Sequence, residues 1–225
     1  MGARTEPPPH DRLPLTGEPL PLDLVNTTFI RGGVRGQLLD ALGEPGDLDR
    51  WLALHRGGFS DDLARYLADP PPAGDVHLAR FVELRHALRG LAGARARRRT
   101  PGVRDVQVVN AAVRLASRWS ELDAFPAADA RSALDARSAF VAVPRWPEPD
   151  PLLVALGEVA AQGVRLFTGE DAEKIRACPA PGCVLYFLKV PVRREWCTVS
   201  CGNRVRVARH SRRMRGYDGS AGAGG

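Results

Sequence analysis

The feature that most constrains this chain of 225 residues is a set of four cysteines confined to a segment of 24 residues. Four thiolates are the ligand set of a closed, tetrahedral structural zinc site. The alternatives are four buried structural thiols or a redox pair, but the segment lacks the C-x-x-C spacing usual for redox pairs. Ligation by four sulfurs in a small finger favours zinc over iron, so we predict one structural zinc ion. The spacing is C-x4-C-x13-C-x3-C, and the predicted ligands are Cys178, Cys183, Cys197 and Cys201.

The residues around these cysteines predict a β-hairpin followed by a helix. Two prolines and a glycine between the first two cysteines favour a tight turn. Residues 184–190 (VLYFLKV) form a strand-like run, and we expect residues 195–196 to return beside it. Cys201 follows Cys197 by four positions, so both sulfurs lie on one face of the helix that begins there. This arrangement of a hairpin and a helix around zinc resembles the treble clef. A unit of about forty residues buries too little apolar surface to fold alone, so we expect it to need the metal. Its small apolar core is expected to contain Tyr186, Phe187 and Trp196.

Positive charge is concentrated in the cysteine-containing region. The formal net charge of the chain is +6, yet residues 174–215 hold 11 lysines and arginines against Glu195 alone. Such asymmetry indicates a polyanionic partner for this end of the chain. Compositional bias alone would explain the preference for arginine over lysine, but it would not explain why the arginines gather after the cysteines. A solvated basic face is the alternative to a binding surface.

A basic helix held by zinc predicts nucleic-acid binding, with DNA as the expected partner. Arginines would contact phosphates, and the asparagine and histidine beside them offer hydrogen-bonding groups for phosphates or base edges. The predicted nucleic-acid-binding residues are Arg193, Arg194, Asn203, Arg204, Arg206, Arg209, His210, Arg212 and Arg213.

The remainder of the chain predicts an α+β fold, with a mainly helical N-terminal domain and a small sheet. We expect this domain to span residues 21–168 and the finger to span residues 170–215. The Pro-rich residues 1–20 are predicted to be disordered, and residues 216–225 to form a flexible tail.

Apolar spacing and capping residues place the expected elements. Residues 22–29 look like a short strand, and residues 120–125 and 138–143 could pair as strands. Periodicity predicts the longest helix at residues 75–99. We expect Asp47 and Ser60 each to cap the start of a helix. Another helix is expected to start at Thr100–Pro101 and reach Trp119, and a further one to start at Asp150–Pro151 and end before Gly169.

Asn26 and Thr27 are the residues of the N-terminal domain whose role the sequence leaves open. They could cap a turn, or they could line a ligand pocket and make the domain a sensor of a small-molecule effector. The chain lacks G-x-S-x-G, P-loop, H-E-x-x-H and dinucleotide-binding motifs, so we do not expect an enzyme. The rival hypotheses are a protein-docking module and an enzyme with its site in the N-terminal domain.

No membrane segment or secretion signal is apparent, so we expect a cytoplasmic protein without a membrane partner. A homodimer could form through exposed faces of Phe125, Val141 and Val143, although these residues could equally pack inside the domain.

Two parts of the chain resemble known bacterial families. The finger resembles the CGNR zinc finger through Trp196–Cys197, the run Cys201-Gly202-Asn203-Arg204, and the basic helix that follows. The N-terminal domain is similar to the ABATE domain, through LDLVNT at residues 22–27 and LLDALGEPGDLDRWLALH at residues 38–55. The resemblance implies a stress-linked transcription regulator that binds DNA through the finger. Many CGNR fingers have four residues between the last two cysteines, whereas this chain has three.

Overall fold

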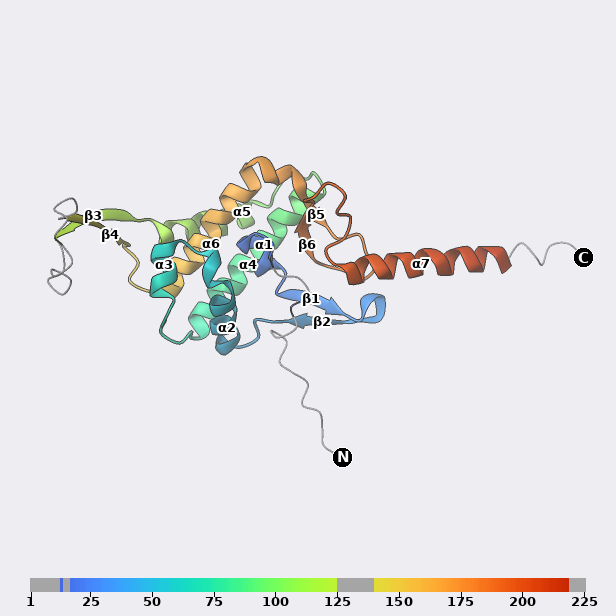
Figure 1. Cartoon of the computed structure of the whole chain (residues 1–225), viewed down its shortest axis with the longest axis horizontal. Coiled ribbons are helices and arrows are strands. Elements are labelled where there is room, and N and C mark those ends of the chain that lie inside the picture. The colour runs from blue at the N-terminus through green and yellow to red at the C-terminus, as the bar shows by residue number, and fades with distance from the viewer. Residues whose placement is uncertain (1–12, 14–16, 125–139, 219–225) are drawn as a thin grey trace, which may run out of the picture.

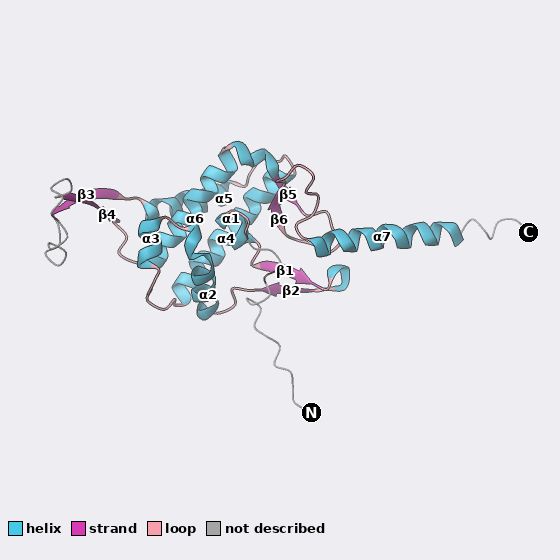
Figure 2. Cartoon of the chain, viewed as in Figure 1, coloured by secondary structure: helices cyan, strands magenta, loops and turns pink. Residues whose placement is uncertain are grey.

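The computed structural model describes residues 13, 17–124 and 140–218. A helical body lies at the centre, the strand pair β3–β4 extends from one end of it, and helix α7 extends from the other (Figure 1). Figure 2 shows that helices dominate and that the described strands form small separate pairs. The predicted α+β fold, mainly helical and followed by a small finger, is confirmed.

The helices begin and end close to capping and turn residues. They are α1 (Leu20–Val25), α2 (Pro45–His55), α3 (Asp61–Tyr66), α4 (Asp75–Ala96), α5 (Val103–Val113), α6 (Pro151–Thr168) and α7 (Val199–Asp218), with the 3₁₀ turns η2 (Gly33–Arg35), η3 (Arg56–Gly58), η4 (Arg114–Ala116) and η5 (Glu170–Lys174) between them.

Each described sheet is an antiparallel pair. Strand β1 (Thr28–Arg31) pairs with β2 (Gln37–Asp40) so that Phe29 faces Leu39. Strand β5 (Ile175–Ala177) pairs with β6 (Tyr186–Leu188). Strand β3 (Trp119–Ala124) pairs with β4 (Phe140–Arg145), which confirms the predicted strand pairing with a shift of one or two residues.

The hydrophobic core of the body lies between α1, α4, α5 and α6. Phe81, Leu84 and Leu88 on α4 are buried as the periodicity predicts, and they belong to one cluster with Leu152 and Val159 of α6. Removing such apolar side chains from water is the main favourable contribution to folding. The long α4 helix thus forms the centre against which the other elements pack.

Two predicted helices have the expected termini. Asp150 caps α6, because its Oδ1 accepts hydrogen bonds from the backbone N–H groups of Leu152 (2.8 Å) and Leu153 (3.4 Å). Gly169 follows the helix as its C-terminal cap. Ser60 stands at the N-terminus of α3 as predicted, but its hydroxyl donates to Glu158 instead of capping the helix.

Three predictions of local structure are wrong. Residues 22–25 are helical, since Pro21 favours a helix start and the short apolar run fits a buried helix as well as a strand. Asp47 lies in the first turn of α2 behind the cap Glu44, where it accepts from the backbone N–H of Glu44 at 3.1 Å. The helix expected from Thr100 to Trp119 begins instead at Val103, because Gly102 is extended, and it ends at Val113.

The predicted chain ends are only partly within the described structure. Residues 1–12, 14–16 and 219–225 lie outside the described residues. Helix α7 continues to Asp218, so residues 216–218 are helical and not part of a flexible tail.

Candidate metal centre

The four predicted cysteine ligands come together at one point. Their sulfur atoms all lie within 4.8 Å of one another, and none forms a disulfide. The Sγ–Sγ distances are 3.7 Å for Cys183–Cys197, 3.8 Å for Cys183–Cys201 and 3.3 Å for Cys197–Cys201. A tetrahedral zinc ion with Zn–S bonds of about 2.3 Å requires sulfurs roughly 3.8 Å apart. The cluster therefore has the donor set and the dimensions of a structural zinc site.

A turn between β5 and β6 and the first turn of α7 bring these sulfurs together. Cys178 and Cys183 lie in the loop that joins β5 to β6, where the N–H of Cys183 donates to the carbonyl of Ala180 at 3.0 Å. Gly182 permits this turn, because its φ of +70° is unfavourable for residues with a side chain. Cys201 lies in the first turn of α7, four residues after Cys197, and their 3.3 Å separation shows that the three-residue gap allows both to reach one ion.

The predicted hairpin has the wrong second strand. Its strands are β5 and β6, on either side of the first cysteine pair, while residues 195–196 lie in an irregular turn segment. Pro191 follows β6 and lacks an N–H for ladder pairing, and its carbonyl accepts from Arg194 in a turn. The treble-clef-like order of hairpin and helix remains, with the hairpin shifted towards the N-terminus.

The thiols hold one another in different protonation states when no metal is bound. Hydrogen bonds from Cys183 and then Cys197 lower the pKa of Cys178 to about 2, whereas the hydrogen bond to Cys178 raises the pKa of Cys183 to about 12. Hydrogen bonds to Cys178 and Cys183 also raise the pKa of Cys197. Zinc needs all four sulfurs as thiolates, so its uptake releases protons and its affinity falls as the pH falls.

Arg204 contacts the metal centre directly. Its Nη2 donates to Sγ of Cys201 at 3.0 Å, and its Nε is buried without a hydrogen-bond partner. A charge-assisted hydrogen bond of this kind holds a sulfur ligand in position. Arg204, predicted as a phosphate contact, therefore supports the zinc site.

The apolar wall around the cysteines is built from two distant parts of the chain. Phe29 and Ala41, from the β1–β2 hairpin, are buried in one cluster with the cysteines, Phe187 and Val205. Trp196 packs against this cluster, and its indole lies so close to Gly202 that a Cβ there would stand 2.8 Å from the ring. Tyr186 instead belongs to the core of the body, so the expected finger core of Tyr186, Phe187 and Trp196 is only partly right.

Comparison with known families agrees with this geometry. Residues 18–170 match the ABATE family, described as "putative stress-induced transcription regulator", and residues 174–214 match the CGNR zinc finger. This chain belongs to the ABATE family. No curated protein matches the chain. The four clustered cysteines of the CGNR finger form the site of one structural zinc ion.

Asn26, from the LDLVNT motif of the ABATE domain, joins that domain to the CGNR finger through two hydrogen bonds. Its side chain is fully buried, with Nδ2 donating to the carbonyl of Tyr186 at 2.9 Å and Oδ1 accepting from the same residue's N–H at 3.0 Å. Thr27 is also fully buried, donates to the carbonyl of Leu24 and accepts from Arg85. Both residues use their polar groups inside the protein, so we assign them a structural role in place of the ligand-pocket alternative.

Two arginines of α4, one buried and one half-buried, complete this attachment. Arg85 is 2% exposed and donates to Asp40 at the end of β2, with Nη2–Oδ2 at 2.7 Å. Arg89 donates to the carbonyls of Val184 at 2.9 Å and of Thr28 at 3.0 Å, and burial lowers its pKa. One helix of the ABATE domain thus holds both the β1–β2 hairpin and the CGNR finger.

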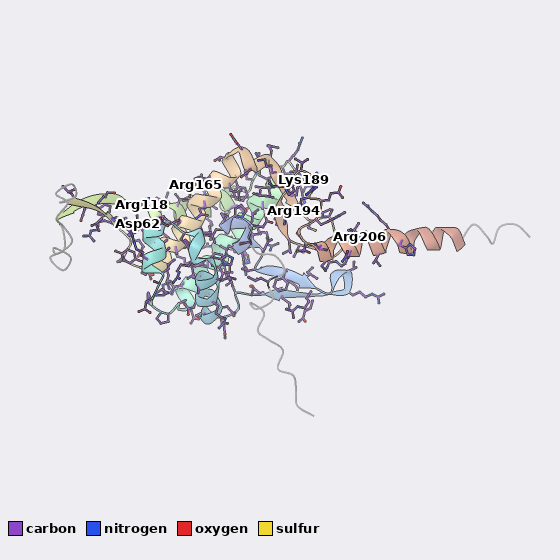
Figure 3. The ribbon with its side chains drawn as sticks, viewed as in Figure 1. Asp62, Arg118, Arg165, Lys189, Arg194 and Arg206 are labelled. Carbon is purple, nitrogen blue, oxygen red and sulfur yellow. The ribbon has the colours of Figure 1, made fainter. Side chains whose placement is uncertain are left out.

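Arg194, which the sequence predicts as a phosphate contact, also belongs to this attachment. It forms an ion pair with Glu18 (2.7 Å), donates to the carbonyl of Cys197 (2.8 Å), and lies over the ring of Phe187 at 4.8 Å. Figure 3 shows Arg194 where the finger meets the body, whereas Arg206 stands on α7. The sequence could not reveal the pairing with Glu18, because that residue lies in a distant segment.

Most of the other predicted nucleic-acid-binding residues have exposed side chains. Their exposed members are Arg193, Asn203, Arg206, Arg209 and His210. Arg212 and Arg213 lie within α7, but their side chains lie outside the part of the chain that the structure describes. The β1–β2 hairpin adds the exposed Arg35, which sequence reasoning missed, since only the fold brings Gly33 of that hairpin next to Arg204.

Among the described helices, none is long and apolar enough to cross a membrane.

Substituting Asn26→Ala should loosen the finger from the ABATE domain. The change leaves the buried N–H and carbonyl of Tyr186 without partners, which costs about 1–3 kcal/mol of unfolding free energy. Chemical denaturation measures this loss, with the exposed Asn110→Ala as a matched control within about 0.5 kcal/mol of the unaltered chain. Equal effects of the two substitutions would contradict the assigned role.

Substituting Arg204→Gln should weaken zinc binding without removing a ligand. Loss of the hydrogen bond to Cys201 is expected to lower zinc affinity about tenfold or more, as is usual for groups that support a metal ligand. Competition with a colorimetric chelator measures the affinity. The control is Arg206→Gln, which removes the same charge two residues along α7, and a similar loss there would contradict a specific role for Arg204.

Proposed function

We propose that this protein is a zinc-dependent DNA-binding regulator that contacts DNA through helix α7 of the CGNR finger. We further propose that it acts in the cytoplasm at the nucleoid, and by binding instead of catalysis. The single observation that carries the proposal is the exposure of basic residues on one face of a helix whose first turn is held by the metal site.

The exposed basic face is opposite the zinc core. With about 3.6 residues per turn, positions 203, 206, 209 and 210 share one side of α7, and position 213 follows at the same spacing. Cys201 and Val205 are buried on the other side. Helix α7 contains six arginines and one aspartate, so its charge suits a polyanion.

The shape of the helix also supports this proposal. Its 20 residues give a length of roughly 30 Å, and its distal part stands clear of the body in Figure 1. The major groove of B-DNA is about 12 Å wide and admits an α-helix. The helical body would then remain outside the DNA groove, while the arginines of α7 reach phosphates on both sides of that groove.

Within the exposed face, two residues are arranged for contacts beyond simple charge. Asn203 accepts a hydrogen bond from Arg206 on the next turn, which orients that guanidinium along the helix. Arg209 lies 5.9 Å from the ring centre of Trp196, which limits its motion near the body. Oriented arginines lose less conformational entropy on binding than free ones.

A docking module is the second candidate, and exposed apolar residues of the finger favour it. Val192 is 84% exposed and Val199 is 79% exposed, and Val190 and Val207 of the same finger are also exposed. Apolar residues that gather at a surface can mark a site for a protein partner. In that case α7 would meet an acidic protein surface.

A homodimer remains a separate proposal. Phe125 lies outside the described residues, Val141 is described only as a residue of β4, and Val143 is half-buried. The β3–β4 pair exposes Leu122 and Trp119, which are apolar residues available to a second copy.

DNA binding should be tight at low salt and should weaken steeply as salt rises. Each neutralised phosphate contributes a slope of about −0.9 to the logarithm of affinity against the logarithm of salt concentration. The double substitution Arg206→Gln/Arg209→Gln is therefore expected to make the slope less steep by about 2. Fluorescence anisotropy with a labelled duplex measures affinity across the salt series.

The matched control removes the same charge from the ABATE domain, through the exposed Arg104 and Arg165. The control should keep the slope of the unaltered chain. Loss of DNA binding on zinc removal is also expected, since the metal fixes the start of α7. Zinc-loaded protein that binds no DNA at low salt would contradict the proposal and favour the docking module.

A further inference from the structure

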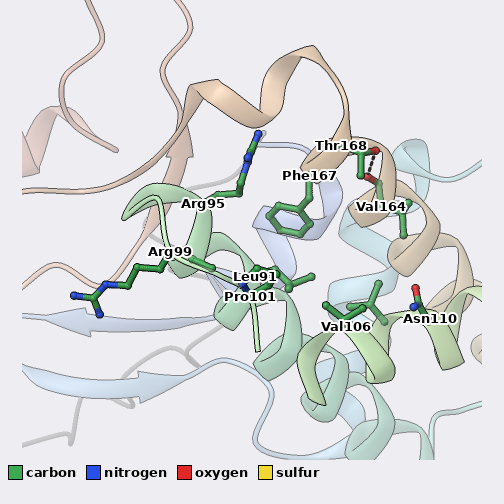
Figure 4. Close-up of a pocket in the computed structure, with 11 residues that line it drawn as sticks. Leu91, Arg95, Arg99, Pro101, Val106, Asn110, Val164, Phe167 and Thr168 are labelled. Carbon is green, nitrogen blue, oxygen red and sulfur yellow. Dashed lines mark hydrogen bonds between the residues drawn. The ribbon is translucent and has the colours of Figure 1, made fainter. Parts of the chain in front are cut away.

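The ABATE domain contains a cavity away from the metal centre. It has a volume of about 340 Å³ and lies between the end of α4, the start of α5 and the end of α6. Its walls are mostly apolar, and Figure 4 shows Phe167 at the centre with Leu91 and Val106 around it. Cavities of roughly 300 Å³ or more with apolar walls and a few polar groups are typical of small-molecule sites.

The charged residues that line this cavity are two arginines. Arg95 and Arg99 lie on one side of it, and Val106 and Asn110 lie on the other (Figure 4). None of the residues that line it is acidic. In Figure 4 the side chain of Arg99 extends away from Phe167 and from Arg95. An apolar interior with arginines on one side is complementary to a molecule with an apolar body and an anionic end.

We propose that this cavity binds a small organic carboxylate, whose apolar part lies against Leu91, Val109 and Phe167 and whose carboxylate meets Arg95. An uncharged apolar compound would leave the guanidinium of Arg95 unused, and a cation would be repelled by it. A carboxylate can accept paired hydrogen bonds from arginine, which fixes its orientation.

The present partner of Arg95 supports this assignment. Its Nη2 forms an ion pair with Oε1 of Glu173 at 2.8 Å, so the guanidinium already holds a carboxylate at this edge of the cavity. The side chains of Arg95 and Glu173 are 41% and 71% exposed, and such surface pairs exchange partners at little cost. A bound carboxylate would replace Glu173, which therefore competes with the ligand.

This exchange would affect the connection between the two domains. Glu173 lies in η5, which runs directly into β5 of the CGNR finger. A ligand that takes Arg95 from Glu173 would break a charged contact between α4 and the residues leading into the finger. The binding itself is independent of the proposed DNA binding, because it can be measured on the protein alone.

Calorimetric titration of the zinc-loaded full chain with octanoate tests the proposal, with octanamide as the uncharged counterpart. We expect saturable binding of one octanoate per chain below about 1 mM, and at least about fivefold weaker binding of octanamide. Binding of both compounds with equal affinity, or no saturable binding of octanoate, would overturn the proposal.

Three pairs of variants locate the site. Val106→Phe fills the cavity and should abolish binding, whereas Val103→Phe on the same helix lies outside the lining and should not change it. Arg95→Gln should weaken octanoate binding several-fold, while Arg99→Gln, whose side chain extends away from the cavity, should have a smaller effect. Circular dichroism confirms that each variant folds before titration.

The third pair tests the competition. Glu173→Gln frees Arg95 and should tighten octanoate binding roughly two- to fivefold, as expected for the loss of an exposed ion pair. Glu170→Gln removes the same charge from the same 3₁₀ turn and should have a smaller effect. Octanoate binding that persists unchanged in Val106→Phe, or that responds equally to the two glutamate substitutions, would overturn the proposal.

Discussion

The demand of one zinc ion for four sulfurs at fixed separations is the constraint on which the finger depends. It can be met only if the loop between β5 and β6, the turn before α7 and the first turn of α7 converge. The metal thereby sets where α7 starts and in which direction it leaves the body. Arg204, which stands in the C-G-N-R run, donates to Cys201 and joins the helix to its own metal site.

The finger does not surround its metal alone. Phe29 and Ala41 of the ABATE domain supply part of the apolar wall around the cysteines, and Arg85 holds the hairpin that carries them. Asn26 and Arg89 join the same domain to β6 and to the loop before it. The two family motifs of the chain, LDLVNT and the CGNR finger, are therefore parts of one interface. A change in the ABATE domain has a direct structural route to the base of α7.

Local patterns were enough to predict the metal ligands, the longest helix, the capped start of α6 and the pairing of β3 with β4. Each of these depends on residues close in sequence or on one type of side chain. The errors arose where distant contacts decide the outcome. In the sequence Arg194 is one more basic residue of the finger, but in the structure it forms an ion pair with the distant Glu18. Residues 22–25 read as a strand until their burial against α4 and α6 is known. The cavity beside Arg95 likewise depends on three helices that the sequence does not place together.

The central claim is that the zinc core is built jointly by the finger and the β1–β2 hairpin. Hydrogen–deuterium exchange of the full chain, with zinc and after chelation, tests this most directly. The account predicts that zinc removal increases exchange in residues 178–205 and also in residues 28–41, while α4 and α6 stay protected. An increase confined to the finger, with the hairpin unchanged, would contradict the shared core.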